Sequence, residues 1–160
     1  MREVSPDPQL YDLVPFTAGE RVFAVFANQV DSTAEAKLPA ALPQSPPGVL
    51  GVVCVRGRML TVLDPFALLT GETNSWPAVL PNVIALTGDE QLALAAGERL
   101  DTITISAGDI EPPATENDEE DPARVALGIA RYGGQEITVL SVANLFAAAM
   151  RRNERRRRRF

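Results

Sequence analysis

The chain contains 160 residues, of which 46% are hydrophobic and 22% are charged, and histidine is absent. A chain of this size can bury one core or two small cores in close contact. The absence of histidine removes the usual general base, the commonest metal ligand and every Ser-His or Cys-His arrangement. The net charge of the chain is −6. The last ten residues carry seven Arg and one Glu, a charge of +6, so the first 150 residues carry a charge of −12.

The strands expected in the first half are separated by glycine-containing and proline-rich breaks. They are Leu10 to Thr17, Arg21 to Ala27, Val49 to Val55 and Met59 to Leu63. Four prolines between residues 38 and 48 indicate a surface loop, because proline cannot donate to a ladder. Asp64 can cap a short helix that starts at Pro65, runs through Leu69 and stops at Gly71.

The second half predicts a similar series of elements. The expected strands are Val83 to Leu86, Gln91 to Ala95, Arg124 to Tyr132 and Glu136 to Leu140. The segment 111–122, with its acidic run at 116–121, is expected to be a mobile solvated loop and not a metal site, because it lacks the spacing and central Gly of a calcium loop. Ser141 can cap a helix of Val142 to Met150 that continues into the tail.

Two other features concern the environment of the chain. The single cysteine, Cys54, lies in an apolar run and is expected to be a small buried hydrophobe. No apolar run reaches the roughly 20 residues that span a bilayer, and the N-terminus lacks the apolar core of a signal peptide. We therefore expect a cytoplasmic protein with no direct membrane insertion.

An internal repeat links the two halves of the chain. Gly51, Gly57 and the triplet Thr61-Val62-Leu63 recur without a gap 77 positions later as Gly128, Gly134 and Thr138-Val139-Leu140. A weaker match aligns residues 16–26 with residues 86–96. The repeat predicts a duplicated β unit.

The pattern Gly51-x-x-x-x-Arg56-Gly57, followed by an apolar strand ending in Leu63-Asp64 and a short helix, resembles the signature of CheW, the coupling protein of bacterial chemosensory arrays. The resemblance extends from about Tyr11 to Phe146. It implies a mainly β fold of two small five-stranded SH3-like β-barrels packed together, with short helices including a C-terminal one. The expected domain spans 1–160, with subdomains at about 11–76 and 82–146 and an Arg-rich helix end and tail at 147–160.

The same resemblance implies a non-enzymatic adaptor without a cofactor. Its partners would be the cytoplasmic hairpin of a methyl-accepting chemoreceptor, a CheA-type histidine kinase and other CheW-like proteins. The receptor-binding positions that match are Val30, Asp31, Arg56 and Gly57, and Arg56 ranks first because its planar guanidinium can hold carbonyls or a carboxylate in a fixed geometry.

The sequence also departs from the family pattern. Cys54-Val55 stands where Asn-Leu is common, Thr61 replaces a proline, and the segment 96–99 replaces a Val-Asp pair in the second half. Second-half surfaces serve kinase docking in the family, so the resemblance implies receptor binding more strongly than kinase binding. A divergent adaptor similar to FrzB of a gliding-motility chemosensory system fits these departures.

Alternative interpretations remain open. Arg56 can be a solvated turn residue, Val30 ordinary core, Asp31 a turn residue and Asp64 only a helix cap. The tail predicts binding of nucleic acid or another anionic surface through its cations, or a disordered end. These cations are Arg151, Arg152, Arg155, Arg156, Arg157, Arg158 and Arg159. An enzyme is the weakest hypothesis, because the carboxylates show no spacing that suggests a mechanism.

Overall fold

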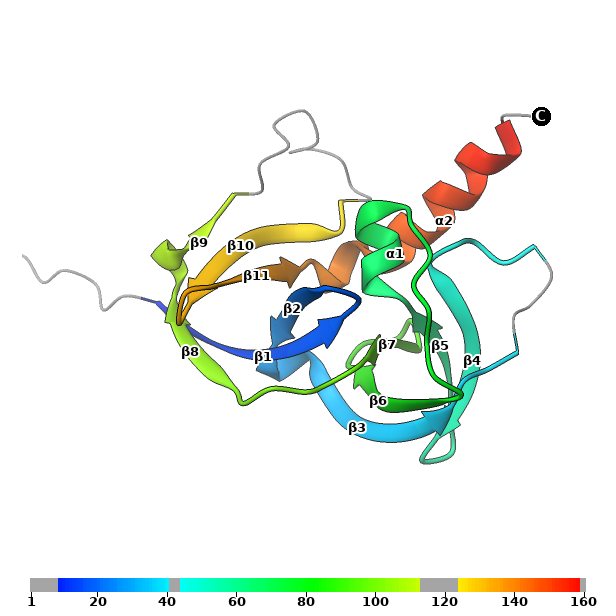
Figure 1. The fold of residues 1–160 in the computed structure, drawn as a ribbon, viewed down its shortest axis with the longest axis horizontal. Helices are drawn as coiled ribbons and strands as arrows, with labels where there is room; N and C mark the ends of the chain where they lie inside the picture. The colour runs from blue at the N-terminus through cyan, green and yellow to red at the C-terminus, as the bar shows by residue number, and fades with distance from the viewer. Residues whose placement is uncertain (1–8, 41–43, 113–123, 159–160) are drawn as a thin grey trace, which may run out of the picture.

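The structure, a computed structural model, describes residues 9–40, 44–112 and 124–158. It consists mostly of strands, with a short helix α1 and a longer C-terminal helix α2 (Figure 1). The strands are β1 Leu10–Ala18, β2 Arg21–Phe26, β3 Val30–Lys37, β4 Val49–Val55, β5 Arg58–Leu63, β6 Val79–Leu86, β7 Leu92–Ala96, β8 Ile103–Ser106, β9 Ile110–Glu111, β10 Ala126–Tyr132 and β11 Gln135–Leu140. The helices are α1 Pro65–Thr70 and α2 Val142–Arg158, with 3₁₀ turns η1 Ala27–Gln29 and η2 Ala107–Asp109.

The strands form two curled sheets, so the mainly β fold predicted from the sequence is confirmed. One sheet has the order β8-β1-β2-β11-β10-β9 and the other the order β3-β6-β7-β5-β4. The predicted count of five holds for the second sheet, which we call the β3–β4 sheet after its edge strands. The first, the β8–β9 sheet, has six strands because η2 separates β8 from β9.

The two halves of the chain exchange their opening hairpins. The β1–β2 hairpin pairs with β8 to β11 of the second half, and the β6–β7 hairpin pairs with β3 to β5 of the first half. The two junctions correspond, since β2 runs parallel to β11 and β7 runs parallel to β5. The hydrogen-bonded sheets therefore do not follow the contiguous division at 11–76 and 82–146 expected from the repeat.

The repeated glycines occupy corresponding places in the two sheets. Gly51 pairs with Val62 and Gly128 with Val139, each next to a register shift in its strand pair. A Cβ on Gly51 would lie 2.7 Å from the Cβ of Pro39, and one on Gly128 would lie 2.7 Å from the carbonyl oxygen of Glu111. Both positions are glycine because another chain segment passes over them closely.

Most of the predicted elements are confirmed within one or two residues, but one boundary differs by more and three strands were missed. The strands β3, β8 and β9 were not predicted, and β6 begins at Val79 instead of Val83. The early start of β6 includes Pro81, which is tolerated because the register between β3 and β6 shifts at this point. The acidic run 116–121 and residues 41–43 of the proline-rich loop lie outside the described residues.

The helices cover the apolar core between the sheets. The α1 helix is capped as predicted, with the Asp64 carboxylate accepting from the backbone N–H groups of Phe66 and Ala67, and it ends at Gly71 in a left-handed conformation. The α2 helix begins directly after Ser141 and buries Leu145, Ala148 and Ala149, and it continues into the tail through Arg158, as the sequence predicted. No helix among the described residues is long and apolar enough to cross a membrane.

Candidate functional site

The turn between β4 and β5 carries the residue that the sequence ranked first. Arg56 has φ of 51° and Gly57 has φ of 79°, so both central residues of this two-residue turn are left-handed, as in a type I′ turn. A left-handed residue with a side chain costs about 1–2 kcal/mol. The corresponding residues in the repeat are Gly133 and Gly134, with φ of 59° and 78°, so the same turn is made there without this cost.

The Arg56 side chain is exposed and has no hydrogen-bond or ion-pair partner among the described residues. Local structure therefore gives no reason for arginine at this position, and glycine would serve the turn better. A residue that keeps an unfavourable backbone conformation without a stabilising contact is a candidate for binding a partner.

The other predicted binding residues lie at the start of β3. Val30 pairs with Leu86 and Ser32 pairs with Ala85, so Asp31 is the extra residue of a β-bulge. Val30 is half-buried against the central core, whereas Asp31 is exposed. Val30 thus packs against this core with part of its side chain, and the Asp31 carboxylate lies on the surface.

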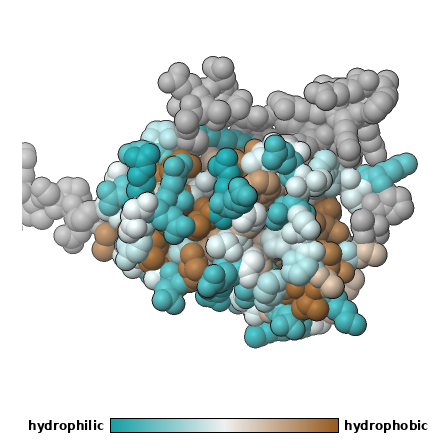
Figure 2. All heavy atoms as spheres, viewed as in Figure 1, coloured by the Kyte–Doolittle hydropathy of each residue, from teal (hydrophilic) through white to brown (hydrophobic). Residues whose placement is uncertain are grey.

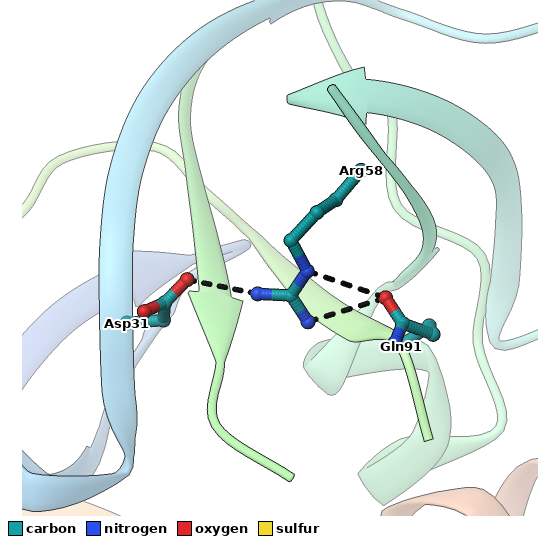
Figure 3. A network of polar contacts seen from close by, with 3 residues as sticks. All are labelled: Asp31, Arg58 and Gln91. Carbon is teal, nitrogen blue, oxygen red and sulfur yellow. Dashed lines mark hydrogen bonds and ion pairs between the residues drawn. The ribbon is translucent and has the colours of Figure 1, made fainter. Parts of the chain in front are cut away.

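Arg58, which the sequence did not single out, joins this bulge to the rest of the sheet (Figure 3). Its Nη1 donates to Oδ2 of Asp31 at 2.8 Å, and its Nε and Nη2 donate to Oε1 of Gln91 at 3.3 and 3.2 Å. Arg58 shares the buried face of β5 with Leu60 and Val62. Because β6 and β7 separate β3 from β5 in the sheet, the ion pair bridges the concave side of the curled sheet at its end.

We call this end of the β3–β4 sheet the rim, and it is made of Val30 and Asp31 on β3, Arg56 and Gly57 in the turn, Arg58 on β5 and Gln91 before β7. All six residues belong to one end of the β3–β4 sheet. Val30, Asp31, Arg56 and Gly57 were proposed from the sequence. The sequence predicted the turn that holds Arg56 and Gly57, but it did not predict β3, which begins with Val30 and Asp31. Arg58 and Gln91 were missed because their link spans 33 residues and no local pattern reveals it.

The outer face of the β4–β5 hairpin is apolar and exposed. Val52 and Met59 are 41% and 61% exposed, and Cys54 pairs directly with Met59. Figure 2 shows apolar side chains gathered at the lower right of the molecule, where Figure 1 places the ends of β3 and β4. The expectation that Cys54 is buried is wrong, because Val53 and Val55 take the inward positions of β4 and Cys54 alternates to the outside.

The segment that departs from the family pattern in the second half has a structural role. Thr17 accepts through its carbonyl from the N–H of Gly97, and through its hydroxyl from the N–H of Glu98. A Cβ on Gly97 would lie 2.9 Å from this hydroxyl oxygen. Arg99 donates to the hydroxyl of Thr33 at 2.8 Å. The segment after β7 therefore connects β1 of one sheet to β3 of the other.

The described residues offer no arrangement typical of a catalytic site. Asp64 is the only buried acidic residue among them, and its oxygens accept from the backbone of α1 and from Nε1 of Trp76 at 2.9 Å. Burial raises its pKa, while the bonds from Trp76, Ala67 and Phe66 act in the opposite direction. Glu20 and Glu136 line a surface hollow of about 230 Å³, but both are exposed.

The Arg-rich tail is helical at least as far as Arg158, since α2 includes six of its seven arginines. The side chains from residue 151 onward, and all of Arg159, lie outside the described residues. Met150 and Phe146 are 45% and 48% exposed on the preceding turns. The helix thus changes from an apolar packing element to a cationic segment near Met150.

A family model for the CheW-like domain matches residues 12–150. The chain belongs to the CheW-like domain family. CheW-like domains are non-enzymatic scaffolds that couple components of chemotaxis signalling, with chemoreceptors and CheA-type kinases as their general partners. The fold of this CheW-like chain is similar to the crystal structure of the scaffolding protein TtCheW from Thermoanaerobacter tengcongensis. The TM-score is 0.67 at 18% identity, covering 84% of this chain and 90% of that one, and among curated proteins none matches.

Proposed function

We propose that this CheW-like protein is a cytoplasmic chemosensory adaptor that binds the cytoplasmic hairpin of a methyl-accepting receptor at Val30, Asp31, Arg56 and Gly57. The observation that carries this proposal is Arg56, which lies in a left-handed turn, has no side-chain partner in the part of the chain that the structure describes, and corresponds to a glycine in the repeat. Arg56 is free to donate to carbonyls or to a carboxylate of a helical hairpin. The exposed apolar face beside it, with Val52 and Met59, would supply contact area.

A CheA-type kinase and other CheW-like proteins are the further partners that we propose. The segment 96–99 is occupied in joining the two sheets, so kinase docking would need other second-half surfaces. Within the family we place the chain as a divergent adaptor, similar to FrzB of a gliding-motility system. Co-precipitation of receptor and kinase together identifies a coupler, whereas receptor alone identifies a modulating adaptor.

Receptor affinity of the rim variants tests the proposal. Arg56→Ala and Val30→Asp should each weaken binding of a purified receptor cytoplasmic fragment about tenfold or more, as expected for loss of a charge-assisted bond or burial of an unpaired carboxylate. Arg56→Gly is the sharper variant, because glycine is the residue that the repeat uses in the same turn. The Arg56→Gly protein should fold as the wild type does but should bind the receptor fragment more weakly.

Arg131→Ala, on β10 of the other sheet, is the matched control and should bind as the wild type does. Unchanged affinity in folded Arg56→Gly and Arg56→Ala proteins would remove Arg56 from the site. Absence of binding by the wild-type protein to any receptor hairpin would remove the proposed function itself.

The continuation of α2 through Arg158 favours a second candidate function, binding to a nucleic acid or another anionic surface through the tail. A helix concentrates the arginine charge over about 12 Å, at 1.5 Å per residue for residues 151–158. Phosphate binding by such a segment weakens steeply with salt. Duplex DNA retention at 50 mM salt that disappears at 200 mM salt and on deletion of residues 151–160 would support it, and no retention at 50 mM would exclude DNA.

A further inference from the structure

The rim contains a side-chain clamp in which Arg58 uses three of its donors. One end of the guanidinium binds the Asp31 carboxylate, and the other end binds the Gln91 amide oxygen (Figure 3). Gln91 is fixed independently, because its carbonyl accepts from the N–H of Thr61 on β5 at 2.8 Å. The clamp therefore joins the bulge of β3 and the turn before β7 to the strand that follows Arg56 and Gly57.

Unusual backbone conformations coincide with this clamp. Arg56, Gln91 and Gln44 are the non-glycine residues with positive φ in the described part of the chain, and the first two lie at the rim. Asp31 is the bulged residue of β3. Strained backbone is retained where surrounding contacts hold it in place, and bulges redirect side chains. At the rim, Gln91 and the bulged Asp31 are joined by the contacts of Arg58, and Arg56 lies in the turn two residues before Arg58.

The clamp contributes orientation more than global stability. The Arg58 and Asp31 side chains are 35% and 49% exposed, and ion pairs with this exposure add little to the free energy of unfolding. Asp31 is also neutralised by the pair, whereas the Arg56 side chain remains without a partner among the described residues. Among Asp31, Arg56 and Arg58, Arg56 is therefore the residue that presents an unpaired charge.

We infer that Arg58 is a positioning residue: it holds Asp31 and Gln91 so that the rim is rigid, and it leaves Arg56 as the cation that binds a carboxylate of the partner. Asp31 then contributes to the proposed receptor-binding surface through its ion pair with Arg58, which holds the bulge in place, and not by contacting the receptor itself. The inference rests on the proposed function for the identity of the partner, but the clamp itself can be tested in the free protein.

Hydrogen exchange in the full-length free protein tests the clamp. Arg58→Ala should speed amide exchange at residues 30–32 and 87–91, while the thermal midpoint and the exchange of β10 and β11 stay unchanged. Arg131→Ala is the matched control and should alter neither rim segment. Unchanged exchange at residues 30–32 in Arg58→Ala would overturn the inference, whatever the receptor result.

Receptor affinity tests the role of the clamp in binding. Receptor affinity should fall about three- to tenfold in Arg58→Ala, in Asp31→Ala and in the double variant. The double variant should lose no more than either single variant, because both changes remove the same ordering of one interface segment. Arg58→Lys should recover part of the loss, because an ammonium can pair with Asp31 but cannot bridge to Gln91 in the same planar geometry. The double variant Asp31→Arg with Arg58→Asp should also recover part of the receptor affinity, because it keeps an ion pair between the same two positions.

Direct contact of Asp31 with the receptor predicts a different pattern. Asp31→Ala would then lose affinity while Arg58→Ala kept it, and this result would overturn the inference. If rim exchange responds to Arg58→Ala but the wild-type protein binds no receptor fragment, the clamp stands and the proposed function fails. Replacing the acidic residues of the bound receptor segment by amides should abolish the difference in receptor affinity between wild type and Arg56→Ala. Persistence of that difference would overturn the inference that Arg56 binds a carboxylate of the receptor.

Discussion

The β4–β5 and β10–β11 hairpins have corresponding backbones and different surfaces. Each has a glycine beside a register shift and a two-residue turn with both central residues left-handed. At the tip, Arg56 in the first hairpin corresponds to Gly133 in the second. On the outer face, the exposed cross-strand pair Cys54 and Met59 corresponds to Arg131 and Glu136. The duplication kept the positions that make the fold, whereas the exposed positions diverged.

The coverage of the two hairpins differs in the same way. In the β8–β9 sheet, β9 pairs with β10 and passes over Gly128. In the β3–β4 sheet, Pro39 and Ala40 of the proline-rich connection pass over Gly51, and β4 remains an edge of the sheet. Proline cannot extend the ladder. The first hairpin therefore keeps an open edge beside an apolar face and a cationic tip, and our proposal that it is the receptor-binding side rests on these features.

The largest expected effect comes from filling the two covered glycines. Gly51→Ala combines φ of 146° with a contact to Pro39, and Gly128→Ala places a Cβ 2.5 Å from Ile110 Cγ2 and 2.7 Å from the Glu111 oxygen. Each should lower the free energy of unfolding by about 2–3 kcal/mol. Urea unfolding followed by the fluorescence of Trp76 measures both. A Gly51→Ala loss no larger than that of Gly133→Ala, where the space is open, would contradict the close approach.

A smaller effect is expected from giving the first helix the residue that precedes the second. Asp64 corresponds to Ser141, and Asp64→Ser keeps a capping oxygen but loses the bond from Trp76, at about 1–2 kcal/mol. Burial raises the Asp64 pKa. The contribution of this carboxyl group to the free energy of unfolding is therefore full below the ordinary carboxyl pKa, and it declines as pH rises through the raised value. The difference in thermal midpoint between wild type and variant should shrink with rising pH, and growth of the difference would contradict the raised pKa.

Exchanging the two tips should change stability by about 1 kcal/mol in opposite directions. Arg56→Gly relieves a left-handed side chain and should raise the thermal midpoint by about 3 °C, while Gly133→Arg should lower it by a similar amount. The double variant should melt close to the wild type. Destabilisation by Arg56→Gly would show that Arg56 serves the fold, and the argument for its binding role would fail.

The smallest stability effect is expected from exchanging the outer faces. Cys54→Arg combined with Met59→Glu reproduces the pair of the second hairpin at two exposed positions. The free energy of unfolding should change by about 0.5 kcal/mol or less, while receptor affinity should fall because apolar contact area is removed. Arg131→Cys combined with Glu136→Met is the reverse exchange and should leave receptor affinity unchanged. Equal affinity of the first variant and wild type would exclude this face from the interface.

The sequence predicted the features that local chemistry determines. The turn at Arg56 and Gly57, the Asp64 cap and the stop at Gly71 follow from residue types at fixed offsets. The exposure of Cys54 was missed because an apolar run does not show which face of an edge strand is covered. The clamp of Arg58 and the exchange of hairpins were missed for a related reason, since both depend on segments that meet only in the folded chain.

The exchanged hairpins also govern how this protein folds during synthesis. Val22 of β2 pairs with Ile137 of β11, so the β8–β9 sheet cannot close until residue 137 has left the ribosome. Pairings between such distant segments slow folding, because the entropy of closing the chain is lost before the contacts form. All strands of the β3–β4 sheet are present by residue 96. This sheet can therefore form earlier, and the β1–β2 hairpin can pack against it before β11 is made. We therefore expect the end of the molecule that bears Arg56 to form before the β8–β9 sheet.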